Sequence, residues 1–143
     1  AAGVDRMGQL GLKVVLTLHR DVASPSVWGM LARALARRAC VIGYDLVNEP
    51  HTPRDADGAE SCCDNPATDV STLVADYSEM AQAIRAEDPL TAIVLSSSFW
   101  GARQALPLLL RALPTEEALP MDSVIFTFHM YEPRQLTCRR ENR

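Results

Sequence analysis

Four short apolar runs, separated by longer segments with helical periodicity, constrain the fold of this chain more than any other feature. The runs are Lys13–Leu18, Val41–Val47, Thr91–Leu95 and Val124–Phe128. They are rich in β-branched and aromatic residues, and their nearly continuous apolarity is typical of strands buried on both faces of a parallel sheet. Strands of this kind need right-handed crossovers. The pattern therefore predicts an α/β fold.

The segments between the runs predict the crossover helices. Ser26 is placed to cap a helix that continues through Ala36. Residues 70–87 carry apolar side chains at helical spacing and are followed by Pro89, and residues 104–113 form a further apolar helix that Pro107 interrupts. Residues 1–10 resemble the last turns of a helix, and Gly11 is placed to end it.

Polar residues follow directly on the predicted strands. His19 follows the first run, Asn48-Glu49-Pro50 follows the second, and His129 follows the fourth. Pro50 ends its strand because it has no backbone N–H to donate. In α/β sheets and barrels, ligands bind at the carboxyl ends of the strands. These residues are therefore expected at one ligand-binding edge.

Length and composition limit the possible functions. The 143 residues fit one domain, residues 1–143, with a net charge of −4 and no basic cluster before the tail, which argues against nucleic acid as the main partner. No apolar stretch approaches the roughly 20 residues of a membrane span. The first residues lack the features of a signal peptide, and the chain does not begin with Met, as expected for a mature product or an interior piece.

We expect structural rather than catalytic roles for the cysteines and for Asp45, the other acidic residue of the second run. Cys40, Cys62, Cys63 and Cys138 lack the C-x-x-C spacing of a zinc site, so no metal is expected. Cys40 is interpreted as a buried thiol. For Cys62 or Cys63 with Cys138, both a bridge and free thiols stay open. Asp45 is interpreted as structural, with a buried partner such as an Arg.

The motifs resemble glycoside hydrolase family 5, the cellulase-type (β/α)8 barrels. Residues 41–50 resemble the family signature around its acid/base, and residues 11–19 resemble the third strand with its terminal His. Residues 83–89 resemble the segment before the fifth strand, and residues 124–133, with His129 and Tyr131, resemble the sixth. The resemblance implies a TIM (β/α)8 barrel. About four of its βα units are present, the third to the sixth strands, since a whole barrel needs about 250 residues.

The resemblance implies hydrolysis of O-glycosyl bonds in β-linked polysaccharide, of the cellulose, β-glucan or mannan type, by a retaining two-glutamate mechanism without a cofactor. Glu49 would be the general acid/base, and Asn48 would bind the sugar's 2-hydroxyl. Tyr131 would bind the nucleophile, His129 would orient sugar or carboxylates, and His19 and Trp100 would line the sugar site. For Trp100, core packing stays open. A secreted, extracellular enzyme would fit this family.

The chain departs from the family pattern in its second half. The nucleophilic glutamate of the seventh strand has no counterpart, and neither Glu132 nor Glu141 is expected to replace it. The segment alone is therefore expected to be inactive. Two alternatives remain: a non-catalytic carbohydrate-binding remnant or pseudogene product, and a metal-dependent hydrolase that uses His19, His51 and His129. The oligomeric state is left open.

Overall fold

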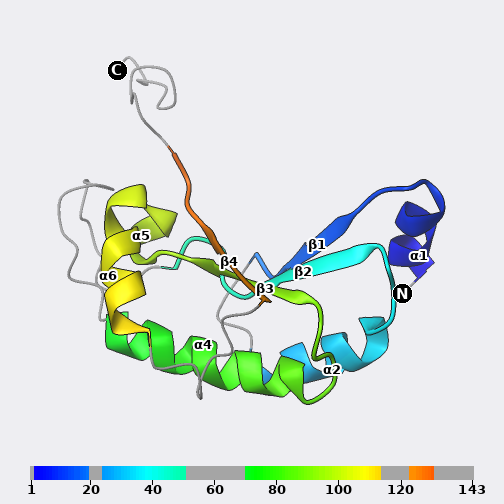
Figure 1. The fold of residues 1–143 in the computed structure, drawn as a ribbon, viewed down its shortest axis with the longest axis horizontal. Helices are drawn as coiled ribbons and strands as arrows, with labels where there is room; N and C mark the ends of the chain where they lie inside the picture. The colour runs from blue at the N-terminus through cyan, green and yellow to red at the C-terminus, as the bar shows by residue number, and fades with distance from the viewer. Residues whose placement is uncertain (1, 20–23, 51–69, 114–122, 131–143) are drawn as a thin grey trace, which may run out of the picture.

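The computed structural model describes residues 2–19, 24–50, 70–113 and 123–130. Strands and helices alternate along these segments (Figure 1). The elements are α1 (Ala2–Gln9), β1 (Val14–Thr17), α2 (Pro25–Leu35), β2 (Val41–Asp45), α4 (Val70–Arg85), β3 (Ala92–Ser96), α5 (Ser98–Gly101), the 3₁₀ turn η1 (Arg103–Ala105), α6 (Leu106–Ala112) and β4 (Val124–Thr127). Each of the four apolar runs forms a strand, as predicted.

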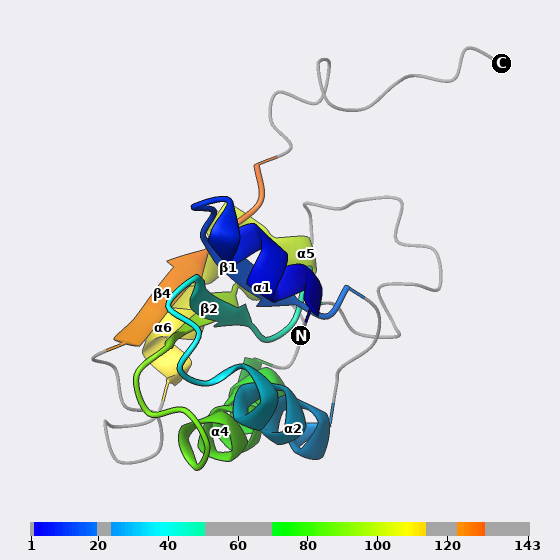
Figure 2. The same ribbon diagram turned by 90° about the vertical axis from the view of Figure 1, so that its right-hand side faces the viewer.

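The four strands form one parallel sheet in the order β1-β2-β3-β4. Strands that follow the chain order, joined by crossovers of one hand, place their helices on the same side of the sheet. Figures 1 and 2 show α2 and α4 side by side beneath the strands. A sheet wound in one direction with helices on one side is the arrangement of a (β/α) barrel wall rather than of a doubly wound sheet. The predicted fold class is confirmed.

The hydrophobic core lies between the sheet and helices α2 and α4. Trp28 of α2 is fully buried and meets the ring of Tyr44 of β2 edge-on, with the ring centroids 6.1 Å apart. Helix α4 contributes its predicted apolar face, and β3 contributes alternate residues. The other large, fully buried core residues are Leu46, Tyr77, Met80, Ile84, Ile93, Leu95 and Leu109.

The expected burial of every strand on both faces is wrong for the outer strands β1 and β4, and in the inner strand β2 it fails at Ile42, which is 46% exposed. In β3, residues 93–96 are all buried. By contrast, Val15 of β1 is 49% exposed and Ile125 of β4 is 51% exposed. Val15 lies on the same face as Gly43 and Val94, because a side chain at Gly43 would meet both valines. This face is opposite the one that packs on α2 and α4, and in a barrel it corresponds to the interior.

Two helix boundaries differ from the sequence prediction. Helix α2 begins two residues earlier than expected, with Ser24 as the N-cap and Pro25 in the first turn, so Ser26 does not cap it. Pro107 does not interrupt α6 but lies in its first turn. Proline favours the first turn of a helix, where its missing N–H is not needed. The left-handed backbone of Gly11 (φ +75°) after α1 agrees with the prediction.

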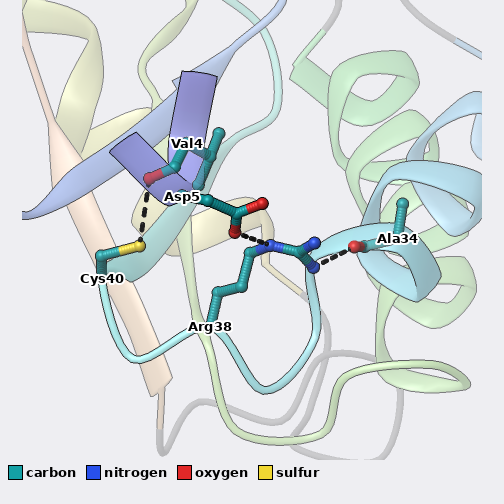
Figure 3. Close-up of polar contacts among 5 residues, drawn as sticks. All are labelled: Val4, Asp5, Ala34, Arg38 and Cys40. Carbon is teal, nitrogen blue, oxygen red and sulfur yellow. Dashed lines mark hydrogen bonds and ion pairs between the residues drawn. The ribbon is translucent and has the colours of Figure 1, made fainter. Parts of the chain in front are cut away.

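Helix α1 is held to the loop before β2 by polar contacts (Figure 3). The Arg38 guanidinium donates to Asp5 Oδ1 at 2.7 Å and also to the carbonyl oxygen of Ala34. The Cys40 thiol lies 3.6 Å from the carbonyl oxygen of Val4 and is a free, half-buried cysteine rather than a fully buried one. The other three cysteines lie outside the described residues.

Asp88 closes the turn between α4 and β3. Its carboxylate accepts hydrogen bonds from Tyr44 Oη at 2.9 Å, Thr91 Oγ1 at 2.7 Å, and the backbone N–H groups of Leu90 and Thr91 at 3.1 Å each. Burial alone would raise the pKa of Asp88. The hydrogen bonds, those from Thr91 first among them, outweigh burial and hold the pKa below its ordinary value of 3.8. The carboxylate form therefore stabilises the fold.

We expect Asp88→Ala to lower the free energy of unfolding by about 2–4 kcal/mol at neutral pH, because it leaves two hydroxyls and two backbone N–H groups without their acceptor. The folded pKa is depressed, so this contribution is complete above about pH 5 and is lost as the pH falls through the folded pKa. Urea unfolding at neutral and acidic pH measures both effects. A difference between variant and parent that does not shrink in acid would contradict this assignment.

No helix among the described residues is long and apolar enough to cross a membrane. The same residues contain no group of three or more His, Cys, Asp or Glu side chains arranged to hold a metal ion.

Candidate active site

The strand register explains why residues far apart in the sequence meet at one edge of the sheet. Asp45 of β2 pairs with Val94 of β3, and Val94 pairs with Ile125 of β4. Four residues beyond Asp45 is Glu49, and four residues beyond Ile125 is His129. Glu49 and His129 therefore lie at the same height, just beyond the carboxyl ends of β2 and β4. Only β3 separates these two strands.

Glu49 and His129 are in direct contact across this edge. His129 Nδ1 lies 2.7 Å from Glu49 Oε1, and the two side chains keep 31% and 23% of their surface exposed. A carboxylate would accept the bond from an Nδ1–H, and a carboxylic acid would donate it to a bare Nδ1. The contact thus fixes one carboxyl oxygen of Glu49, and the partial exposure leaves the pair accessible from the ligand-binding edge.

The backbone at Glu49 has an unusual conformation. Glu49 has φ +49° and Trp100 has φ +59°, in the left-handed region that residues other than glycine seldom adopt. Such conformations cost about 1–3 kcal/mol and persist only where the surrounding structure holds them. The two residues are neighbours in space, since the Trp100 N–H donates to the carbonyl oxygen of Pro50 at 3.0 Å. Of the three non-glycine residues with positive φ in the described part of the chain, two thus lie at this site, and the third is Arg37.

The segment after β3 also contacts His129. The His129 N–H donates to the carbonyl oxygen of Gly101 at 2.7 Å, and Ala102 and His129 form a parallel β-bridge. The Ser97 hydroxyl donates to the carbonyl oxygen of Ala102 at 2.7 Å. The sequence placed Trp100 at the sugar site but did not indicate that this segment contacts His129. The glycine directly after Trp100, which permits a left-handed backbone, was the available signal.

Asp45 lies one step below the pair on the barrel-interior face. Burial raises the pKa of Asp45, and a hydrogen bond from Thr17 and the proximity of His129 partly offset the shift. Its Oδ1 atom is buried and has no hydrogen-bond partner among the described residues. No arginine partner of Asp45 is seen among the described residues. Thr17 of the neighbouring strand β1 supplies a hydrogen bond to this carboxyl group instead. Asp45 is therefore a second carboxyl group within electrostatic reach of His129.

The other predicted site residues are placed less closely. Asn48 is half-buried beside Glu49, and Trp100 is half-buried at the end of β3, where its backbone contacts Pro50. His19 is exposed just beyond β1, at the same edge of the sheet. Tyr131, together with His51, Glu132 and Glu141, lies outside the described residues. The structure thus joins Glu49 and His129 directly and leaves His19 at the rim.

A parallel sheet of sequential βα units, with a carboxyl–imidazole pair at its carboxyl edge, defines the class of (β/α)-barrel proteins with an acidic site on the ligand face. The family can be specified as well. The model for cellulase, glycosyl hydrolase family 5, matches residues 1–142. The chain belongs to this family.

Solved structures of similar fold agree with this class. Endoglucanase Cel5A of Pseudomonas stutzeri is 23% identical, with a TM-score of 0.69 over 97% of this chain and 45% of that one. A β-glucanase of Saccharophagus degradans is 15% identical, with a TM-score of 0.66 over 90% and 39%. Endo-glycoceramidase II of a Rhodococcus species is 18% identical, with a TM-score of 0.53 over 68% and 35%.

The chain spans less than half the length of each of these three structures. At these identities the likeness establishes the fold. No curated protein sequence matched the chain.

Proposed function

We propose that this chain carries the acid/base half of a retaining glycosidase site that hydrolyses β-linked glucans or mannans. The observation that carries the proposal is the 2.7 Å contact between Glu49 and His129 at the carboxyl edge of the sheet. Membership of the cellulase family supports the reaction class. The endoglucanase and β-glucanase among the solved structures support a β-linked glucan as substrate.

In the proposed mechanism, Glu49 first protonates the glycosidic oxygen as the leaving group departs, and it then takes a proton from the water that attacks the glycosyl-enzyme intermediate. His129 holds one carboxyl oxygen of Glu49 and thereby orients the carboxyl group toward the sugar. Asn48 binds the 2-hydroxyl of the sugar, a bond that strengthens in the transition state. His19 and Trp100 line the sugar site, and Tyr131 binds the nucleophile.

A retaining site also needs a second carboxyl group about 5–5.5 Å from the first. We propose that the half of the barrel wall that this chain does not span supplies it, and that the 143-residue segment alone binds sugar without turnover. No cofactor is required, because both steps use carboxyl groups and water. We further propose that the enzyme acts outside the cell, where polymeric β-glycans are found.

Binding of oligosaccharides to the 143-residue chain tests the sugar site without requiring turnover. The chain has three histidines, so selective labelling gives NMR spectra with few signals, and His129→Gln assigns the relevant one. We expect cellotetraose or mannotetraose, but not α-linked maltotetraose, to shift the His129 signal. Asn48→Ala should weaken binding about 2- to 10-fold, the value of one hydrogen bond, whereas the exposed Gln9→Ala should not.

Equal shifts with maltotetraose, or none with either β-linked sugar, would contradict the proposed specificity. The alternative, a non-catalytic carbohydrate-binding protein, predicts the same shifts. It differs in predicting no hydrolysis when the second half of a barrel is supplied. The assays of Glu49 described below separate these two functions.

A further inference from the structure

We infer that residues 98–102, the segment that follows β3, position the Glu49–His129 pair, and that the left-handed backbone of Gly101 sets where His129 lies. The catalytic consequence rests on the proposed function. The geometric part does not, because it concerns only the contacts among the described residues. Gly101 is accordingly a positioning residue and not a catalytic one, and Trp100 enters this inference through its backbone N–H alone.

The segment 98–102 is bonded to the backbone on both sides of the pair. On one side, the Trp100 N–H donates to the carbonyl oxygen of Pro50, the residue directly after Glu49. On the other side, the carbonyl oxygen of Gly101 accepts the N–H of His129 at 2.7 Å. Two adjacent residues therefore link the backbone at Glu49 to the backbone at His129. The side-chain contact between them closes this link into a ring of interactions.

Gly101 is in close contact with the imidazole. A Cβ atom at this position would lie 3.4 Å from His129 Cγ and 3.7 Å from His129 Cβ. Gly101 is buried and has φ +71°, a conformation in which any L side chain is strained. A methyl group at these distances would be in ordinary van der Waals contact with the ring, so the strain comes from the left-handed backbone and not from a clash. An alanine would relieve this strain by shifting the peptide at 101. Because the carbonyl oxygen of Gly101 accepts the N–H of His129, such a shift is expected to move His129.

The left-handed backbone of Glu49 is explained by the same link. A residue in this conformation needs the surrounding structure to hold it. The bond from Trp100 to Pro50 restrains the peptide directly after Glu49, and the bond from Glu49 to His129 restrains its side chain. Because Pro50 is buried, this turn has little room to relax. The segment 98–102 therefore controls the direction in which the Glu49 carboxyl group points.

Gly101→Ala tests the inference, and Gly11→Ala is its matched control. Gly11 has φ +75°, nearly the same conformation, but a Cβ there would have nothing within 4 Å. Both variants are expected to lower Tm of the 143-residue chain by roughly 3–8 °C, the cost of a left-handed alanine. Only Gly101→Ala is expected to shift the NMR signals of the His129 imidazole. If both variants leave these signals unchanged, the inference is wrong.

Trp100→Gly separates the role of the segment's backbone from the role of the indole ring. Glycine adopts φ +59° without strain and keeps the N–H that bonds to Pro50. We expect this variant to retain the His129 signals of the parent. Loss of those signals would show that the ring holds the pair, and it would overturn the backbone account even if Gly101→Ala failed to fold.

Hydrolysis provides the catalytic readout. In a protein that holds the whole barrel, Gly101→Ala should lower kcat/KM about 10²-fold for substrates with poor leaving groups, since a small misplacement of the acid is costly. Gly11→Ala should leave kcat/KM unchanged. Shifted His129 signals together with no Glu49-dependent hydrolysis in the parent would support the positioning and refute the proposed function. Shifted signals with unchanged kcat/KM would overturn the catalytic part of the inference.

Discussion

Glu49→Gln is expected to reduce the hydrolysis of β-linked oligosaccharides by about 10²–10⁴-fold, the range that general acid–base catalysis contributes. Glutamine keeps the size of the side chain and can still bond to His129, but it cannot deliver a proton to the glycosidic oxygen. The assay requires a protein in which this segment forms part of a whole barrel. Sequencing the coding DNA on both sides of the segment would identify such a protein.

The leaving group distinguishes an acid from a structural carboxylate. An unactivated sugar needs its oxygen protonated as it departs, whereas dinitrophenolate leaves without a proton. We therefore expect Glu49→Gln to impair glycosylation strongly for oligosaccharides and only slightly for a dinitrophenyl glycoside. Glu79→Gln, on the exposed face of α4, is the matched control and should change neither rate. An equal loss with both substrates would show that Glu49 does not protonate the leaving group.

Trp28→Ala is expected to lower the free energy of unfolding by about 3–5 kcal/mol, the usual cost of removing a buried aromatic side chain. Trp28 is fully buried, and its ring meets Tyr44 edge-on at 6.1 Å. Since the total stability of a domain is of order 5–15 kcal/mol, this one change should remove a large part of it. Urea unfolding measures the loss from the midpoint and slope.

The same helix supplies a control for Trp28. Met30 lies two residues further along α2 and is 65% exposed, so Met30→Ala should cost less than about 0.5 kcal/mol. Trp28→Phe should cost much less than Trp28→Ala, because the indole Nε1 has no hydrogen-bond partner among the described residues. A Trp28→Ala variant as stable as Met30→Ala would mean that α2 does not pack on the sheet as described.

Most of the fold could be predicted because strands and crossover helices differ in their hydrophobic period. The runs ending at His19, Glu49 and His129 predicted the strands and their common edge. The sequence could not show which side of the sheet would carry helices, so the exposure of Val15 and Ile125 was missed. The start of α2 was misplaced because Ser24 and Ser26 flank Pro25, and only the proline's preference for the first turn separates the two serines.

The site was predicted less completely than the fold. The order of the strands placed Glu49 and His129 at one edge. Their contact depends in addition on the strand register, because each residue lies four positions beyond a residue that pairs with Val94. The role of residues 98–102 was not predictable from the sequence, because it depends on a tryptophan in the left-handed conformation. Such a residue is unfavourable in isolation and is stabilised only by its tertiary contacts.

Azide rescue of Glu49→Ala tests the central claim most directly. Removal of the acid/base leaves room for a small anion that needs no base, so azide should attack the glycosyl-enzyme intermediate formed from a dinitrophenyl β-glycoside in the whole-barrel protein. The account predicts faster turnover with azide and a glycosyl azide product of β configuration. A product of α configuration would mark Glu49 as the nucleophile, and turnover insensitive to azide would contradict its role as the acid/base.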